Sequence, residues 1–181
     1  LSFAGLTAHN NVSLSIPAKS VFAVIGPNGA GKTSLFNCIS GVYRPQSGDV
    51  RLAGESLLGR APYAIAARGV ARMFQNLALF DNLTAREHLT FIGRMYLLPK
   101  DVIRKRIDEL LHLLGLQNDE KKLTLEYSHG MKKKLALAAA LLPNPDLLFL
   151  DEPFEGVDAV TSRVIRDMLS GYVERGSTVF L

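Results

Sequence analysis

A glycine-rich segment, Gly26–Thr33, has the residue types and spacing of a phosphate-binding loop. It fits the pattern G-x-x-x-x-G-K-[ST], follows the apolar run Val21–Ile25 and precedes a helix-forming stretch. Glycines let the backbone turn tightly and approach a phosphate, so that loop N–H groups face the anion. Lys32 is placed to reach the β- and γ-phosphates, and the Thr33 hydroxyl to ligate Mg²⁺. We therefore expect a bound nucleoside triphosphate. The candidate phosphate-binding residues are Gly26, Pro27, Asn28, Gly29, Ala30, Gly31, Lys32, Thr33 and Ser34.

Two adjacent carboxylates form the second chemical element. Asp151 and Glu152 directly follow the apolar run Leu147–Leu150, which has the length and composition of a fully buried strand. Carboxyl ends of strands in open α/β sheets form the edge where ligands bind. Asp151 suits Mg²⁺ positioning, and Glu152 could orient or deprotonate an attacking water. A pair of acids can simply end a strand, but the phosphate loop in the same chain favours the catalytic interpretation.

Composition indicates one globular domain. The chain has 181 residues, 48% of them hydrophobic, and a formal net charge of +4, which fits an anionic ligand, a membrane surface or nucleic acid. The single cysteine, Cys38, excludes an internal disulfide and is expected to be a buried thiol. The apolar run Leu135–Leu142 is too short to cross a bilayer. Because the chain begins without Met and stops inside an apolar run, we expect it to be truncated at both ends.

Hydrophobic periodicity predicts strands alternating with helices. Val12, Leu14 and Ile16 alternate with serines, which indicates a half-buried strand. A helix is expected from Thr33 to Ile39. Further predicted elements are strands at 49–52, 69–74, 147–150 and 178–181, and a last helix at 159–174. The order predicts a parallel α/β core, residues 1–76 and 136–181, interrupted by a helical insert at residues 77–135.

Capping residues mark the helices of the insert. Thr84 followed by Glu87 is a capping-box pattern, and Asp101 is expected to cap the next helix. Gly115 suits the position just after that helix. Ser128 is expected to cap a third helix, Lys132 to Leu142.

In these residues and their order the chain resembles the nucleotide-binding domain of the ATP-binding cassette (ABC) family. The resemblance covers nearly all of the chain and implies a P-loop NTPase with a RecA-like core, an antiparallel β subdomain and a helical subdomain. Phe3 stands where the family has an aromatic that stacks on adenine, and Gln75 where it has a glutamine that touches Mg²⁺ or the attacking water. Asp158 matches the aspartate of the loop after the catalytic glutamate.

The segment Tyr127–Met131 occupies the place of the family signature Leu-Ser-Gly-Gly-Gln. The resemblance implies that Ser128 and Gly130 contact the γ-phosphate of ATP bound to a second subunit. His129 replaces a glycine and Met131 a glutamine, so we expect weaker contacts with that nucleotide. The following lysines are expected to form a solvated helix face; they are Lys132, Lys133 and Lys134.

Two regions resemble different branches of the family. Residues 3–82 resemble the ATPases of branched-chain amino-acid importers, and residues 83–181 those of two-component exporters. The family also has a histidine shortly after the last strand, whereas this chain ends at Leu181. We therefore expect these residues alone to hydrolyse ATP poorly. The histidines present stand elsewhere: His9, His88, His112 and His129.

The resemblance implies an ATP- and Mg²⁺-dependent ATPase, with Glu152 as general base assisted by Lys32 and Gln75, and with Thr33, Gln75 and Asp151 at the metal. It implies a second nucleotide-binding domain and a membrane-spanning subunit as partners, at the cytoplasmic face of a membrane. No nucleic-acid partner is expected. Two alternatives stay open: a soluble ABC-type ATPase acting on ribosomes or DNA, and a non-catalytic nucleotide-binding regulator. The sequence names neither the cargo nor the direction of transport.

Overall fold

A computed structural model describes residues 2–3, 6–7, 10–27, 29–73 and 79–181. Its centre is a parallel four-stranded sheet in the order β3-β8-β7-β6. The strands are β3 (Val21–Phe22), β6 (Val70–Met73), β7 (Leu147–Leu150) and β8 (Thr178–Phe180). The expected α/β class with a parallel core is therefore confirmed, together with the predicted strands before the phosphate loop, before residue 74, at 147–150 and at the end of the chain.

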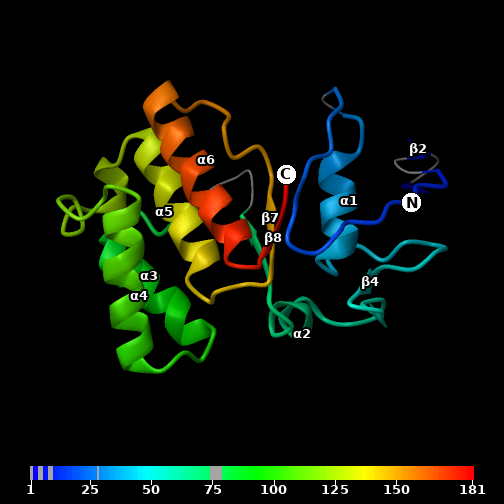
Figure 1. Cartoon of the computed structure of the whole chain (residues 1–181), viewed down its shortest axis with the longest axis horizontal. Helices are drawn as coiled ribbons and strands as arrows, with labels where there is room; N and C mark the ends of the chain where they lie inside the picture. Colours follow the sequence, from blue (N-terminus) through cyan, green and yellow to red (C-terminus); the bar gives the residue numbers. More distant parts are fainter. Residues whose placement is uncertain (1, 4–5, 8–9, 28, 74–78) are drawn as a thin grey trace.

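Alternate side chains of β7 pack into different layers, which explains why this strand is apolar throughout. Phe149 faces α1 (Lys32–Ile39), and its ring centroid lies 5.8 Å from that of Phe36. Leu148 and Leu150 are fully buried in the core of the opposite face. Figure 1 shows the sheet between α1 on one side and the longer helices on the other.

The second layer consists of helices that enclose the larger core cluster. They are α3 (Ala85–Met95), α4 (Lys100–Leu113), the 3₁₀ turn η1 (Thr124–Glu126), α5 (His129–Leu141) and α6 (Ala159–Glu174). α5 and α6 lie next to the sheet, and α3 and α4 lie outside them (Figure 1). The core thus continues from the strands into the segment between β6 and β7. No helix in the described part of the chain is long and apolar enough to cross a membrane.

Smaller elements lie on the α1 side of the sheet (Figure 1). β1 (Ser2–Phe3) and β2 (Leu6–Thr7) form one antiparallel pair, and β4 (Arg51–Leu52) and β5 (Glu55–Ser56) form another. A short helix, α2 (Pro62–Ala66), packs Ile65 against the α1 side of the sheet. The sequence pattern predicted a four-residue strand at 49–52, of which the structure pairs Arg51–Leu52 as β4. It did not predict β5 or α2, whose two and five residues have too little periodicity to detect.

The predicted helix caps are largely confirmed. Thr84 and Glu87 form a complete capping box, in which Glu87 N–H donates to the Thr84 hydroxyl and Thr84 N–H to the Glu87 carboxylate. Ser128 caps α5, which therefore begins at His129, three residues earlier than expected. Gly115 has φ 66°, the left-handed conformation expected after α4.

Two local predictions are wrong. Asp101 does not cap α4, because the helix begins at Lys100 and Pro99 is its N-cap, which leaves Asp101 in the first turn. Residues 12–16 are not a strand: no sheet pairing among the described residues includes them, and Val12 and Leu14 are 53% and 41% exposed. Alternation suits a strand only where a neighbouring edge supplies backbone hydrogen bonds.

Close approach of α3 and α4 requires glycine at residue 93. A Cβ atom added to Gly93 would lie 2.7 Å from Ile103 Cγ1, too close for a real contact. We expect Gly93→Ala to lower the free energy of unfolding in urea by about 1–3 kcal/mol through overpacking. Gly171→Ala is the matched control in α6, because the nearest atom there is the end of Arg175 at 3.7 Å. A cost that persists undiminished in an Ile103→Ala background would contradict this explanation.

Candidate functional site

β3 leads directly into the phosphate loop. Val24 N–H donates to the Leu181 carbonyl at 2.8 Å. The hydrogen bonding between β3 and β8 therefore continues past the last residues of both strands. Gly29 and Gly31 have φ 81° and 92°, a region that favours glycine. Because Gly31 is the N-cap of α1, the free N–H groups and the positive end of that helix open at the loop.

The Lys32 side chain is hydrogen-bonded to the backbone of the phosphate loop. Its Nζ donates to the carbonyl oxygens of Gly26 at 2.7 Å and Pro27 at 3.1 Å. A turn bond from Ala30 N–H to the Pro27 carbonyl, 3.2 Å, lies beside them. These contacts hold the lysine ammonium next to the loop backbone, where it adds positive charge to a ring of amide donors.

A pocket of about 330 Å³ lies between the phosphate loop and the segment after β7. It is lined by Gly29, Gly31, Lys32, Thr33, Ser34, Glu152 and Glu155. The fold thus places Glu152 opposite Lys32 and Thr33, although these residues are far apart in sequence. Glu155 was not predicted as a site residue, because the signal for it is only its position one turn after Glu152.

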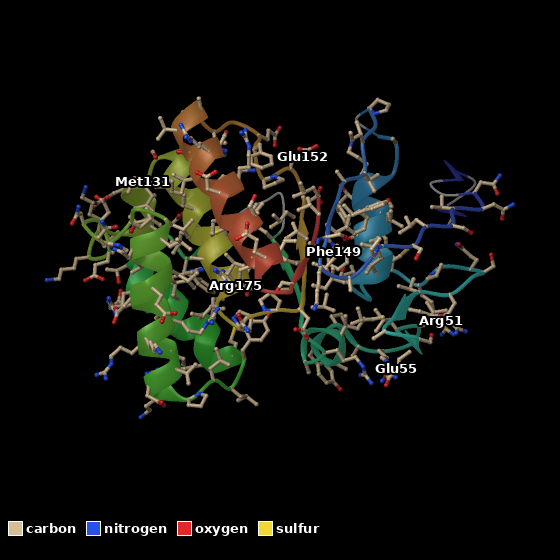
Figure 2. All side chains as sticks on the ribbon, viewed as in Figure 1. Arg51, Glu55, Met131, Phe149, Glu152 and Arg175 are labelled. Carbon is tan, nitrogen blue, oxygen red and sulfur yellow. The ribbon has the colours of Figure 1, made fainter. Side chains whose placement is uncertain are left out.

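Glu152 has an unusual backbone. Its φ is +52°, a left-handed conformation that costs a non-glycine residue free energy unless neighbours hold it. Its carbonyl accepts from Glu155 N–H at 3.2 Å, which closes a tight turn. Figure 2 shows Glu152 at the carboxyl edge of the sheet, between α1 and the helices of the other face.

Asp151 lies behind this pocket and pairs with a buried arginine. Asp151 is 3% exposed, and Arg72 Nη2 of β6 donates to its Oδ2 at 3.2 Å. Arg72 also donates to Asn37 Oδ1 at 2.6 Å and Ser40 Oγ at 3.1 Å, both on the α1 segment. Burial lowers the pKa of Arg72, and the nearby Asp151 carboxylate opposes that shift. Sequence reasoning missed Arg72; the only signal was a charged residue inside an apolar strand.

The segment that resembles the family signature lies at the start of α5. The Ser128 hydroxyl accepts from Met131 N–H at 3.2 Å. A Cβ atom on Gly130 would stand 3.3 Å from Thr161 Oγ1 and 3.6 Å from Asp158 Oδ2, so α5 begins beside α6. Asp158 caps α6 by accepting from Thr161 N–H and Oγ1, each at 2.8 Å, and the backbone bond lowers its pKa. Gly130 and Asp158 thus lie close together near Ser128, and none of the three is among the residues that line the pocket.

Other predicted residues have different outcomes. Asn28 and Gln75 lie outside the described residues, and so does the side chain of Phe3. The expected solvated face is wrong for Lys133, which is 1% exposed, while Lys132 lies 3.7 Å from Asp81 in an ion pair. Cys38 is buried as expected, and burial raises the pKa of its thiol.

The donor groups fit a magnesium ion that phosphates help to hold. Thr33 supplies a hydroxyl at the pocket and Asp151 a carboxylate at the end of β7, and Mg²⁺ prefers oxygen ligands. The described residues contain no group of three or more His, Cys, Asp or Glu side chains placed to hold a metal. In phosphate chemistry, one or two protein oxygens, waters and the substrate usually share the coordination of Mg²⁺.

The Arg72–Asp151 pair generates a stability prediction. Arg72→Met leaves the Asp151 carboxylate buried without this partner, so we expect the free energy of unfolding to fall by about 3–5 kcal/mol in urea denaturation. Adding Asp151→Asn to Arg72→Met should restore part of the lost free energy of unfolding, because the buried carboxylate charge is then removed. Arg51→Met is the control: Arg51 pairs with Asp49 at 2.8 Å but is 68% exposed, so its loss should be clearly smaller. Equal losses at the two arginines would contradict the pairing argument.

Comparison with known proteins identifies related chains. The chain is 36% identical over 174 residues to the daunorubicin resistance ATP-binding protein DrrA3 of Streptomyces coeruleorubidus, covering 96% of this chain and 54% of the relative. It is 35% identical over 176 residues to the high-affinity branched-chain amino acid transport ATP-binding protein BraF of Pseudomonas aeruginosa, covering 87% of this chain and 68% of the relative. The chain thus spans only part of the length of the curated relatives it matches.

A solved structure and a family model agree with these relatives. An ATP-binding cassette of an ABC transporter in its ADP conformation superimposes with a TM-score of 0.84 at 27% identity, covering 96% of this chain and 73% of that one. The model of the family described as ABC transporter matches residues 9–155. With the phosphate loop and the Asp151–Glu152 pair at one sheet edge, these matches establish that the chain belongs to the ABC transporter family.

Proposed function

We propose that this chain binds and hydrolyses ATP and thereby powers an ABC transporter. The observation that supports this most directly is the pocket where Glu152 faces Lys32 and Thr33, because it joins a phosphate-binding loop to an acid. Relatives across nearly the whole chain are named ATP-binding proteins, in drug resistance in one case and in amino-acid transport in another. Both observations favour a nucleotide-driven motor over a regulator without turnover.

ATP binding would use the loop amides and the start of α1. In this structure the Lys32 ammonium donates to the carbonyl oxygens of Gly26 and Pro27. When ATP binds, it would donate to β- and γ-phosphate oxygens instead. Thr33 and Asp151 would hold Mg²⁺, which when bound offsets charge on the phosphates. We assign adenine stacking to Phe3 and a contact with the metal or the attacking water to Gln75. We also assign Asn28 to the phosphate-binding residues, on the sequence pattern of the loop alone.

Hydrolysis would place Glu152 as general base. A water held between the Glu152 carboxylate and the γ-phosphate gives its proton to the carboxylate while its oxygen bonds to phosphorus. The bond from phosphorus to the bridging oxygen breaks, and ADP and phosphate leave. Lys32 stabilises the charge that spreads over the phosphate oxygens. Glu155 also lines the pocket.

A second subunit completes the site in this proposal. Ser128 and Gly130 are at the positive start of α5 and outside the pocket of their own chain, so they are available to the γ-phosphate of a partner's ATP. A head-to-tail pair of nucleotide-binding domains would use both copies, with Asp158 beside the contact. We propose a membrane-spanning subunit as the other partner, which puts the chain at the cytoplasmic face of a membrane.

Glu152→Gln tests the assignment of the general base. In the full-length protein it should bind ATP with a Kd within about twofold of wild type, because the amide keeps the shape of the acid. Its turnover should fall about 10²–10⁴-fold, the usual contribution of a positioned base. The variant should also accumulate as a dimer in the presence of ATP, detected by light scattering, because hydrolysis no longer leads to dissociation of the subunits.

The control is the same substitution at Glu109, an exposed residue of α4 that does not line the pocket. Glu109→Gln should leave turnover and dimer lifetime unchanged. Turnover near wild type in Glu152→Gln, with collapse instead in Glu155→Gln, would reassign the base to Glu155.

A further inference from the structure

A buried lysine contacts the backbone of the candidate general base. Lys133 of α5 is 1% exposed, among the most deeply buried large side chains of the protein. Its Nζ donates to the carbonyl oxygen of Glu152 at 2.8 Å. Burying an ammonium group is costly, so a lysine in this position requires a hydrogen-bond acceptor. The acceptor that the fold supplies belongs to the one residue of the pocket with a strained backbone.

The Glu152 carbonyl receives two donors. Lys133 approaches from α5, and Glu155 N–H approaches from the turn at 3.2 Å. Together they hold the peptide after Glu152 in one orientation, and this orientation accompanies the left-handed φ of +52°. A charge-assisted bond is stronger than a neutral one, so the lysine is the firmer of the two constraints.

α5 also lies close to the chain that follows Glu152, at Gly156 of the turn and at Thr161 of α6. A Cβ atom on Gly156 would stand 3.0 Å from His129 Nε2, and one on Gly130 would stand 3.3 Å from Thr161 Oγ1. The first turns of α5 are therefore fitted closely to the chain that follows Glu152. Lys133 adds a hydrogen bond to this packing between α5 and the chain after Glu152. α5 itself begins at the Ser128 cap.

We propose that Lys133 is a positioning residue for Glu152: its ammonium fixes the Glu152 carbonyl, and through it the backbone that directs the carboxylate toward the phosphate loop. The inference rests on the proposed hydrolysis of ATP at Glu152. Lys133 acts through the backbone and does not touch the nucleotide. Its loss should therefore reduce the chemical step while leaving nucleotide affinity and folding intact.

Lys133→Met in the full-length protein is the decisive variant, because it keeps the length of the side chain and removes the ammonium. We expect kcat for ATP hydrolysis to fall about 10- to 100-fold, the scale of a misplaced catalytic group, with a Kd for ATP within about twofold of wild type. The midpoint of urea unfolding should stay the same or rise, because an apolar side chain replaces a buried charge. Lys134→Met, the same change one residue along α5, should leave kcat unchanged.

Dependence on Glu152 separates positioning from a general structural effect. In single-turnover hydrolysis, Lys133→Met should cause no further loss in a Glu152→Gln background, because both changes disable the same group. Amide hydrogen exchange at Glu155, whose N–H bonds to the Glu152 carbonyl, should speed up in Lys133→Met and not in Lys134→Met. This readout needs no bound nucleotide.

Equal rates in Lys133→Met and Lys134→Met, with unchanged exchange at Glu155, would overturn the assignment. Additive losses with Glu152→Gln would also overturn it. Retained turnover in Glu152→Gln alone counts against the proposed function instead, and the exchange measurement then still decides whether Lys133 holds the Glu152 turn. If Lys133→Met fails to fold, Lys133→Gln, neutral and still a donor, is used with the same expectations and a smaller loss of kcat.

Discussion

The burial of β7 on both faces is the constraint on which the site depends. Phe149 packs against α1, and Leu148 and Leu150 pack into the helical layer, so neither the register nor the end of this strand can shift without exposing a core residue. The two acids that follow are therefore delivered to the carboxyl edge of the sheet. β3 ends at the same edge because β8 lies between β3 and β7 in parallel register. The phosphate loop and the acidic pair meet there for this reason.

Neighbouring acids at this edge have different environments. Asp151 turns into the molecule and pairs with Arg72, whereas Glu152 takes a left-handed backbone and lines the pocket. The two carboxylates are therefore suited to different tasks: Arg72 holds Asp151 in place, where we propose that it serves the metal, and Glu152 lines the pocket as the proposed reacting group. The difference arises from the direction of the chain at the end of β7, since the two side chains are chemically alike.

Buried cations support this edge from opposite sides of the sheet. Arg72 reaches it from β6 on the α1 side, and Lys133 reaches it from α5 on the other. Burying a cation is weak support for stability, since its desolvation offsets much of the attraction to its partner, whether a carboxylate or a carbonyl. Their placement around Asp151 and Glu152 is better explained by orientation of these residues. The signature-like segment is connected to the same region, because Lys133 lies two residues after its last residue, Met131.

The sequence by itself determined the local features: the phosphate loop, the strand before the acidic pair, and the caps at Thr84 and Ser128. Each depends on residues a few positions apart, whose hydrogen bonds form within one turn of chain. Local pattern failed where the partner is distant. Residues 12–16 have strand-like alternation but no pairing edge among the described residues, and the lysine run after Met131 looked solvated although Lys133 enters the core. Only the tertiary structure decided which charges are buried and that Glu152 lines the same pocket as Lys32, because strand order and helix packing bring these segments together.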